Sequence, residues 1–165
     1  MYQTTKTNIM EKTIIAVRGA ADAGKTTAIR CACAQMLSDG ASVESILASP
    51  SFEGIDGYLI RDLTSQSKEG DIAIILSYCN HKIGICSQGD CGCEKQIRAY
   101  LEAFKEVSCD LIICATRTRG RTCETVKAFS VDNGYKLEWF SKLSNRYISL
   151  EALHAKTMEF LNGEK

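Results

Sequence analysis

A loop whose residue types suit phosphate binding spans positions 19–26. Its sequence, GAADAGKT, matches the pattern G-x-x-x-x-G-K-[ST] at every fixed position. The glycines let the backbone turn so that successive N–H groups point at phosphate oxygens. Lys25 supplies a compact positive charge for the β- and γ-phosphates, and Thr26 offers a hydroxyl to Mg²⁺. The pattern therefore predicts a site for a nucleoside triphosphate with magnesium.

The segments on either side of the loop support this prediction. A β-branched run, TIIAVR at 13–18, predicts a buried strand, and a helix is predicted from about Gly24 to Leu37. The N-terminus of that helix adds a partial positive charge beside the same anion. The residues expected to contact the nucleotide are Gly19, Ala20, Ala21, Asp22, Ala23, Gly24, Lys25, Thr26 and Thr27.

At these positions the chain resembles the P-loop NTPase superfamily. With QGD after one predicted strand and CATRTRG after the next, the remaining chain is similar to small bacterial P-loop proteins. The resemblance implies binding of ATP or GTP with Mg²⁺, and either hydrolysis or phosphoryl transfer. It does not identify an acceptor. The chain has no [NT]-K-x-D motif, the usual guanine-reading element of GTPases, so ATP is favoured.

Acidic residues near strand ends are candidates to hold the metal. In open α/β sheets ligands lie at the carboxyl ends of the parallel strands, and the loop defines that edge. Asp90 comes just after the run Gly84–Ser87 and is the first candidate for binding Mg²⁺. Alternatively, Asp90 is a helix N-cap. Asp71 is the rival, because it lies at the same edge if residues 72–78 run antiparallel. Glu94 is a candidate for positioning water.

Arginines follow the apolar run 111–115 and should reach the same edge. Arg117 and Arg119 can stabilise charge that develops on a transferred phosphoryl group. Alternatively they stack on the base, bind an acidic substrate, or belong to a solvated basic loop. With Lys25 and Asp90 they make up the residues expected to act in catalysis.

Nine cysteines occur in the chain. The odd count, the length of the chain and the lack of an export signal argue against a disulfide scaffold, so free thiols are expected. Cys86, Cys91 and Cys93, with Cys79 nearby, form the one local cluster, whose spacing lacks the C-x₂-C of common zinc sites. Cys91 and Cys93 are expected to open a helix, where the helix dipole can lower a thiol pKa.

Strands and helices are expected to alternate along the chain. Strand-like runs lie at 13–18, 42–48, 57–62, 72–78, 82–87, 111–115 and 136–140, and helical patterns lie at 24–37, 97–107, 122–133 and 150–161. The runs from 57 to 87 predict an antiparallel meander with a turn at Cys79-Asn80-His81. Thr122 is expected to cap its helix.

The predicted fold is α/β: a three-layer P-loop NTPase sandwich with a mainly parallel sheet and an antiparallel meander extension. A single nucleotide-binding domain is expected over residues 1–165. Residues 1–11 are interpreted either as a flexible arm or as lying largely before a true start at Met10.

Composition narrows the classes of partner. The formal net charge is zero, which argues against nucleic acid as a partner, since phosphate backbones select a basic surface. No apolar run approaches the roughly 18–20 residues that span a bilayer, so no membrane partner and a cytoplasmic location are expected.

Two functions remain open at this point. The first is a Mg²⁺-dependent ATPase or small-molecule kinase, whose acceptor the sequence does not name. The second is a nucleotide-dependent regulatory switch that binds a partner and has negligible turnover.

Overall fold

The computed structural model describes residues 11–20, 23–48, 71–90, 92–141, 143–144, 147–148 and 150–162. The predicted strand at 57–62 and the loop residues Ala21 and Asp22 lie outside these ranges. The elements follow in the order β1 (Thr13–Arg18), α1 (Lys25–Ser38), β2 (Ser42–Ala48), β3 (Ala73–Tyr78), β4 (His81–Cys86), α3 (Glu94–Glu106), β5 (Leu111–Thr116), α4 (Arg121–Asn133), β6 (Lys136–Phe140), β7 (Leu143–Ser144), β8 (Tyr147–Ile148) and α5 (Leu150–Leu161).

A six-stranded mixed sheet has the order β2-β3-β4-β5-β1-β6. Strand β1 pairs in parallel with β5 and β6, and β5 pairs in parallel with β4. Strand β3 is antiparallel to both β2 and β4, so it alone runs against the other five. One edge of the sheet therefore carries the carboxyl ends of β1, β4 and β5 together with the beginning of β3. We call this the loop edge.

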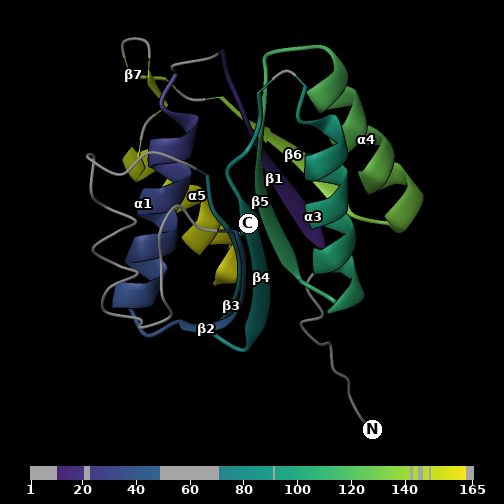
Figure 1. Ribbon diagram of the computed structural model, residues 1–165. Helices are drawn as coiled ribbons and strands as arrows, with labels where there is room; N and C mark the ends of the chain where they lie inside the picture. The colour runs from purple at the N-terminus through teal and green to yellow at the C-terminus, as the bar shows by residue number, and fades with distance from the viewer. Residues whose placement is uncertain are drawn as a thin grey trace, which may run out of the picture.

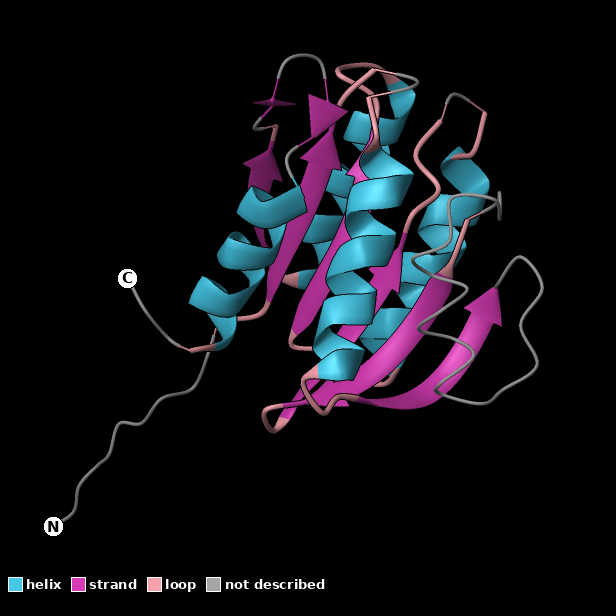
Figure 2. Cartoon of the chain, turned by 90° about the vertical axis from the view of Figure 1, so that its left-hand side faces the viewer, coloured by secondary structure: helices cyan, strands magenta, loops and turns pink. Residues whose placement is uncertain are grey.

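Helices cover both faces of the sheet (Figure 1), with α1 and α5 on one side and α3 and α4 on the other. Figure 2 views the molecule from the side of α1, with the twisted sheet behind the helices. Strand β1 shows how the sequence builds this arrangement. Ile15 and Val17 belong to the core beneath α1, whereas Ile14 and Ala16 belong to the core beneath α3 and α4. A strand buried on both faces reads as a continuous apolar run, which is the pattern of β1.

The hairpin between β3 and β4 confirms the predicted turn. Cys79 and Asn80 have φ angles of 54° and 64°. Two consecutive residues in the left-handed region are the mark of a type I′ turn, whose twist matches that of the flanking strands. The turn lies at the end of the sheet opposite the loop edge.

Two local predictions on the α3–α4 side are wrong. Thr122 does not cap α4, because the N-cap residue is Gly120 and the Thr122 hydroxyl instead accepts a hydrogen bond from the Arg117 N–H at 2.9 Å. Val107, the last residue of the helical pattern predicted at 97–107, lies just beyond the end of α3 at Glu106 and is 40% exposed. No helix in the described part of the chain is long and apolar enough to cross a bilayer.

Candidate functional site

The phosphate-loop motif joins the end of β1 to α1, as predicted. The Gly19 N–H donates to the carbonyl of Thr116 at the end of β5, at 3.1 Å. Gly24 has a φ of 83°, in the left-handed region that favours glycine, and α1 begins at the next residue. The Ala28 N–H then closes the first helical turn onto the Gly24 carbonyl at 2.9 Å. The neighbouring strand and the helix thus fix both ends of the loop.

Lys25 is buried inside its own loop. Its side chain is only 6% exposed, and its Nζ donates to the carbonyl of Gly19 at 2.6 Å and to that of Ala20 at 3.3 Å. Burial lowers the pKa of Lys25 from its ordinary 10.5, the carboxylates of Asp90 and Asp71 oppose this shift, and the guanidinium of Arg117 adds to it. The ammonium therefore lies within electrostatic reach of both candidate metal carboxylates.

Asp71 is the carboxylate that contacts the loop threonine. Its Oδ1 accepts a hydrogen bond from the Thr26 hydroxyl at 3.2 Å and a second from the Ser87 hydroxyl at 2.8 Å. Ser87 is itself fixed, because its Oγ accepts from the Ile72 N–H at 2.9 Å and its own N–H donates to the Ile72 carbonyl at 2.9 Å. The reversed direction of β3 brings Asp71 to the loop edge, as the sequence required of this rival.

Asp90 lies at the same edge but faces a different partner. Its side chain is 64% exposed, and its Oδ1 is 3.5 Å from the Nε of Arg117. The N-cap alternative is wrong, since Cys93 is the N-cap residue of α3 and its N–H donates to the backbone carbonyl of Asp90 at 3.2 Å. The structure thus brings Asp71, and not Asp90, into contact with Thr26.

Gly89 places the segment that carries Asp90 against β5. A Cβ at position 89 would lie 2.6 Å from the Cβ of Ala115 and 2.7 Å from its carbonyl carbon, closer than real Cβ contacts. Only glycine lets the backbone pass here without displacement. This close approach brings Asp90 beside Arg117.

The arginines separate into one fixed residue and two exposed ones. The backbone of Arg117 is anchored at both ends: its N–H donates to Thr122, and its carbonyl accepts from the Thr116 hydroxyl at 2.8 Å. The Arg117 side chain is 31% exposed, whereas Arg119 and Arg121 are exposed on the turn into α4. All three line a pocket of about 360 Å³ between the starts of α3 and α4.

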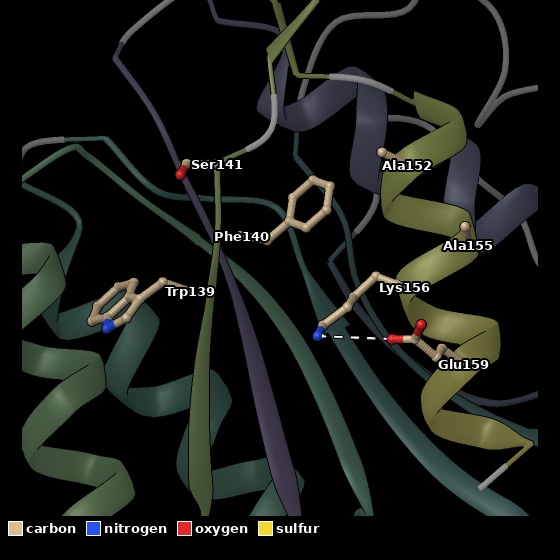
Figure 3. A pocket seen from close by; sticks show the side chains of 7 residues that line it. All are labelled: Trp139, Phe140, Ser141, Ala152, Ala155, Lys156 and Glu159. Atoms are coloured by element: carbon tan, nitrogen blue, oxygen red, sulfur yellow. Dashed lines mark ion pairs between the residues drawn. The ribbon is translucent and has the colours of Figure 1, made fainter. Parts of the chain in front are cut away.

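A larger cavity, of about 740 Å³, lies between β6 and α5. Figure 3 shows Phe140 from β6 and Lys156 from α5 reaching into the space between the two elements. The Lys156 Nζ is 2.5 Å from an Oε1 of Glu138 and 4.0 Å from that of Glu159. A hydrogen bond from Lys156 is the main cause that lowers the pKa of Glu138. None of the described residues of the loop 19–26 lines this cavity, and its lysine is already paired with two glutamates.

The predicted cysteine cluster is divided by the fold. Cys79 lies in the hairpin turn, at the opposite end of β4 from Cys86. Burial, followed by the charges of Asp90 and Asp71, raises the pKa of Cys93, so the expected lowering at a helix start is wrong for this thiol. Cys91 lies outside the described residues. The eight cysteines that the structure describes form no disulfide. Within the described ranges no three His, Cys, Asp or Glu side chains converge as metal ligands.

Ser87 is the site residue that sequence reasoning missed. It was assigned only to the end of a strand, although it donates to Asp71 and fixes its position. A hydroxyl directly after an apolar strand, at the edge that carries the loop, was the available signal.

Comparisons with known proteins supply no further assignment. No family model, no curated protein and no solved structure matches the chain.

Proposed function

We propose that this chain is a P-loop NTPase-type protein that binds Mg²⁺-ATP at the loop of residues 19–26 and hydrolyses it or transfers its phosphoryl group. The observation that carries the proposal is the contact between the Thr26 hydroxyl and the Asp71 carboxylate at 3.2 Å. The motif supplies the hydroxyl, and the segment just before β3, far along the sequence, supplies the carboxylate that contacts it. The three-layer P-loop sandwich belongs to this proposal, supported by helices on both faces of the mixed sheet.

The donor atoms at this point fit magnesium. Mg²⁺ prefers hard oxygen ligands, and Thr26 and Asp71 present a hydroxyl and a carboxylate oxygen within hydrogen-bond distance of each other. An ion held by Thr26 and Asp71 would supply positive charge that stabilises negative charge developing on a phosphoryl group. We assign the Thr26 hydroxyl to direct contact with the ion. The Asp71 carboxylate would help to hold the ion at the same point. Ser87 keeps that carboxylate in place.

Lys25 and the loop backbone bind the phosphates. The Lys25 ammonium is bonded to loop carbonyls, and phosphate oxygens are stronger acceptors because they carry charge. The first N–H groups of α1 would add donors for the same anion. Arg117, half-buried and held by Asp90, is placed to stabilise charge on the transferred group.

A nucleotide titration followed by thermal unfolding tests this proposal. ATP or ADP with Mg²⁺ should stabilise the protein by about 2.7 kcal/mol at a ligand concentration about 100 times Kd. Lys25→Ala should lose most of that gain, whereas Lys127→Ala, an exposed lysine on α4, should keep it. If the nucleotide stabilises Lys25→Ala as much as it stabilises the parent protein, the nucleotide does not bind at the loop of residues 19–26.

Phosphate release measured on the same samples separates an enzyme from a switch. Turnover with Mg²⁺-ATP supports the enzyme. Tight binding with no release of phosphate, with or without candidate acceptors, would instead leave a nucleotide-dependent switch.

A further inference from the structure

We propose that the pocket between the starts of α3 and α4 binds the anionic group, a carboxylate or a phosphate, of a small second substrate. The inference rests on the proposed function, because it gives the chemical class of the molecule that shares the site with the nucleotide. Three arginines from one turn, Arg117, Arg119 and Arg121, line this pocket.

The charge of the pocket is largely uncompensated. Among the residues that the structure describes, no carboxylate pairs with the guanidinium of Arg119 or that of Arg121. The one acidic residue in the lining, Glu94, already accepts a hydrogen bond from the Gly92 N–H at 3.0 Å. The pocket is thus lined by the positive side chains of Arg119 and Arg121, and its one carboxylate, that of Glu94, already accepts a hydrogen bond from a backbone N–H.

Arg117 also lines the pocket and carries a buried donor. Its Nε is buried and makes no hydrogen bond in the described part of the chain, although the Asp90 Oδ1 lies 3.5 Å away. That separation leaves a charge contact without a formed hydrogen bond. An unpaired buried N–H is unfavourable, so the Arg117 guanidinium still has a donor without a hydrogen-bond partner in the described part of the chain.

Guanidinium chemistry specifies the ligand class. The planar fork of an arginine pairs with two oxygens at once, which suits carboxylates and phosphates and does not suit neutral sugars or amines. The volume of about 360 Å³ lies at the lower end of the range for small-molecule sites, about 300–1,000 Å³. A small anionic molecule fits this space, and a nucleic-acid strand does not.

The pocket and the electrostatic surroundings of Lys25 share Arg117. Arg117 lines the pocket and also lies within electrostatic reach of Lys25. A molecule held by Arg119 and Arg121 would therefore lie beside the group that Lys25 and Arg117 are assigned to hold. The larger cavity between β6 and α5 offers no such arrangement, since its lysine is paired with two glutamates.

A titration followed by amide NMR of the ¹⁵N-labelled full chain tests the proposal. Saturating Mg²⁺-ADP is added first, and shifts at Gly24 and Thr26 report whether the loop is filled. Sodium phosphate is then added in one arm and sodium succinate in another, at constant ionic strength. Saturable shifts of the Gly92, Gly120 and Thr122 amides are the expected result, and the arm that saturates at lower concentration tells phosphate from carboxylate.

Paired variants locate the binding. Arg119→Gln combined with Arg121→Gln should weaken the binding of the better anion by about tenfold or more, because the double variant removes two positive charges that line the pocket. The matched control combines Lys95→Gln with Lys127→Gln, which removes the same charge from exposed positions on α3 and α4. The control should bind the anion as the parent protein does.

Different backbone amides report on the two proposals: those of Gly92 and Gly120 report on anion binding in the pocket, and those of Gly24 and Thr26 report on nucleotide binding at the loop. If neither anion gives saturable shifts at Gly92 and Gly120, or if the arginine pair and the lysine pair weaken binding equally, the pocket proposal is overturned. If Mg²⁺-ADP leaves Gly24 and Thr26 unshifted, the proposed function fails. In that case the anion titrations are run without nucleotide and judge the pocket by the same criteria.

Discussion

The hydroxyl of Thr26 donates a hydrogen bond to Oδ1 of Asp71, across 45 positions of sequence. Thr26 lies at the start of α1, which follows β1, and Asp71 lies in the segment just before β3. Strands β4 and β5 lie between β1 and β3 in the sheet. Because the contact depends on the tertiary fold, it separates the two carboxylates that the sequence left as alternatives.

Replacing Asp71 should impair the use of the metal more than the binding of nucleotide. Asp71→Asn keeps the shape but removes the negative charge, so Mg²⁺ affinity should fall about 10–100-fold, while nucleotide affinity in EDTA should change little. Turnover as a function of Mg²⁺ concentration is the measurement. Asp132→Asn, an exposed aspartate on α4, is the matched control.

Asp90→Asn gives the direct comparison. Asp90 contacts Arg117 and not Thr26, so its variant should keep the parent's dependence on Mg²⁺. A normal metal dependence in Asp71→Asn, with a loss in Asp90→Asn, would return the metal role to Asp90.

Arg117 should affect the rate of the reaction more than the affinity for nucleotide. Arg117→Gln removes a charge that we propose acts on the phosphates, and turnover should fall by about 10³-fold if this arginine stabilises the transferred group. The Kd of Mg²⁺-ADP should change by much less, since the role is confined to the transition state. Stopped-flow phosphate release and calorimetry measure the two quantities. A parallel loss of rate and affinity would assign Arg117 to ground-state binding.

Buried thiols should make the protein less stable in alkali. Burial raises the pKa of Cys33, Cys109 and Cys114 to about 12, from an ordinary 9.0. Because the folded pKa is above the unfolded one, their contribution to stability is complete below pH 9 and is lost as the pH rises towards 12. Each thiol should lower the free energy of unfolding by about 1.4 kcal/mol per pH unit within that window.

Urea unfolding between pH 8 and pH 10.5 measures this slope. Cys114→Ala should flatten it, whereas Cys79→Ser, which changes an exposed thiol, should not. Lys25, whose pKa is lowered, acts in the opposite sense below its ordinary 10.5, and comparing the two cysteine variants cancels its effect. An identical slope in both variants would contradict the assignment.

Gly89→Ala should destabilise the protein by about 1–3 kcal/mol, because its new methyl group would press on Ala115. Two of the close contacts are with the backbone carbon and oxygen of Ala115, at 2.7 Å and 2.8 Å. Adding Ala115→Gly therefore should not restore stability. Chemical unfolding of the single and double variants checks this, and full rescue would mean that the methyl–methyl contact alone is responsible.

Local pattern was sufficient to predict most elements of the fold. Strand β2 has the predicted bounds of Ser42–Ala48, and the turn at Cys79 and Asn80 lies where it was expected. The order of the strands within the sheet could not be predicted from local pattern. Nothing in the apolar run of β5 indicates that it lies between β4 and β1, because several buried strands with equivalent patterns can exchange places without changing any local preference. The short β7–β8 pair, with two residues in each strand, was too brief to leave a pattern.

The site was predictable as far as the motif reached. Each described residue of the phosphate loop lies between β1 and α1 or within the first turn of α1. Choosing between Asp71 and Asp90 required the strand register, in which Ala73 pairs with Cys86 and so brings Asp71 to Ser87. Sequence reasoning could place both carboxylates at one edge but could not give the distance of either from Thr26.

The type I′ turn at Cys79 and Asn80 fixes the register of β3 against β4, and this register determines where Asp71 lies at the other end of the sheet. Strands β3 and β4 pair without interruption from Tyr78 and His81 up to Ala73 and Cys86. One residue inserted at the turn would slip this pairing and point the opposite set of β3 side chains at each face. The Asp71 carboxylate would then lose its hydrogen bond with the Thr26 hydroxyl. Surface turns are ordinarily where chains accept insertions most readily. This turn, although it lies far from the proposed nucleotide site, should accept substitutions but not changes in length.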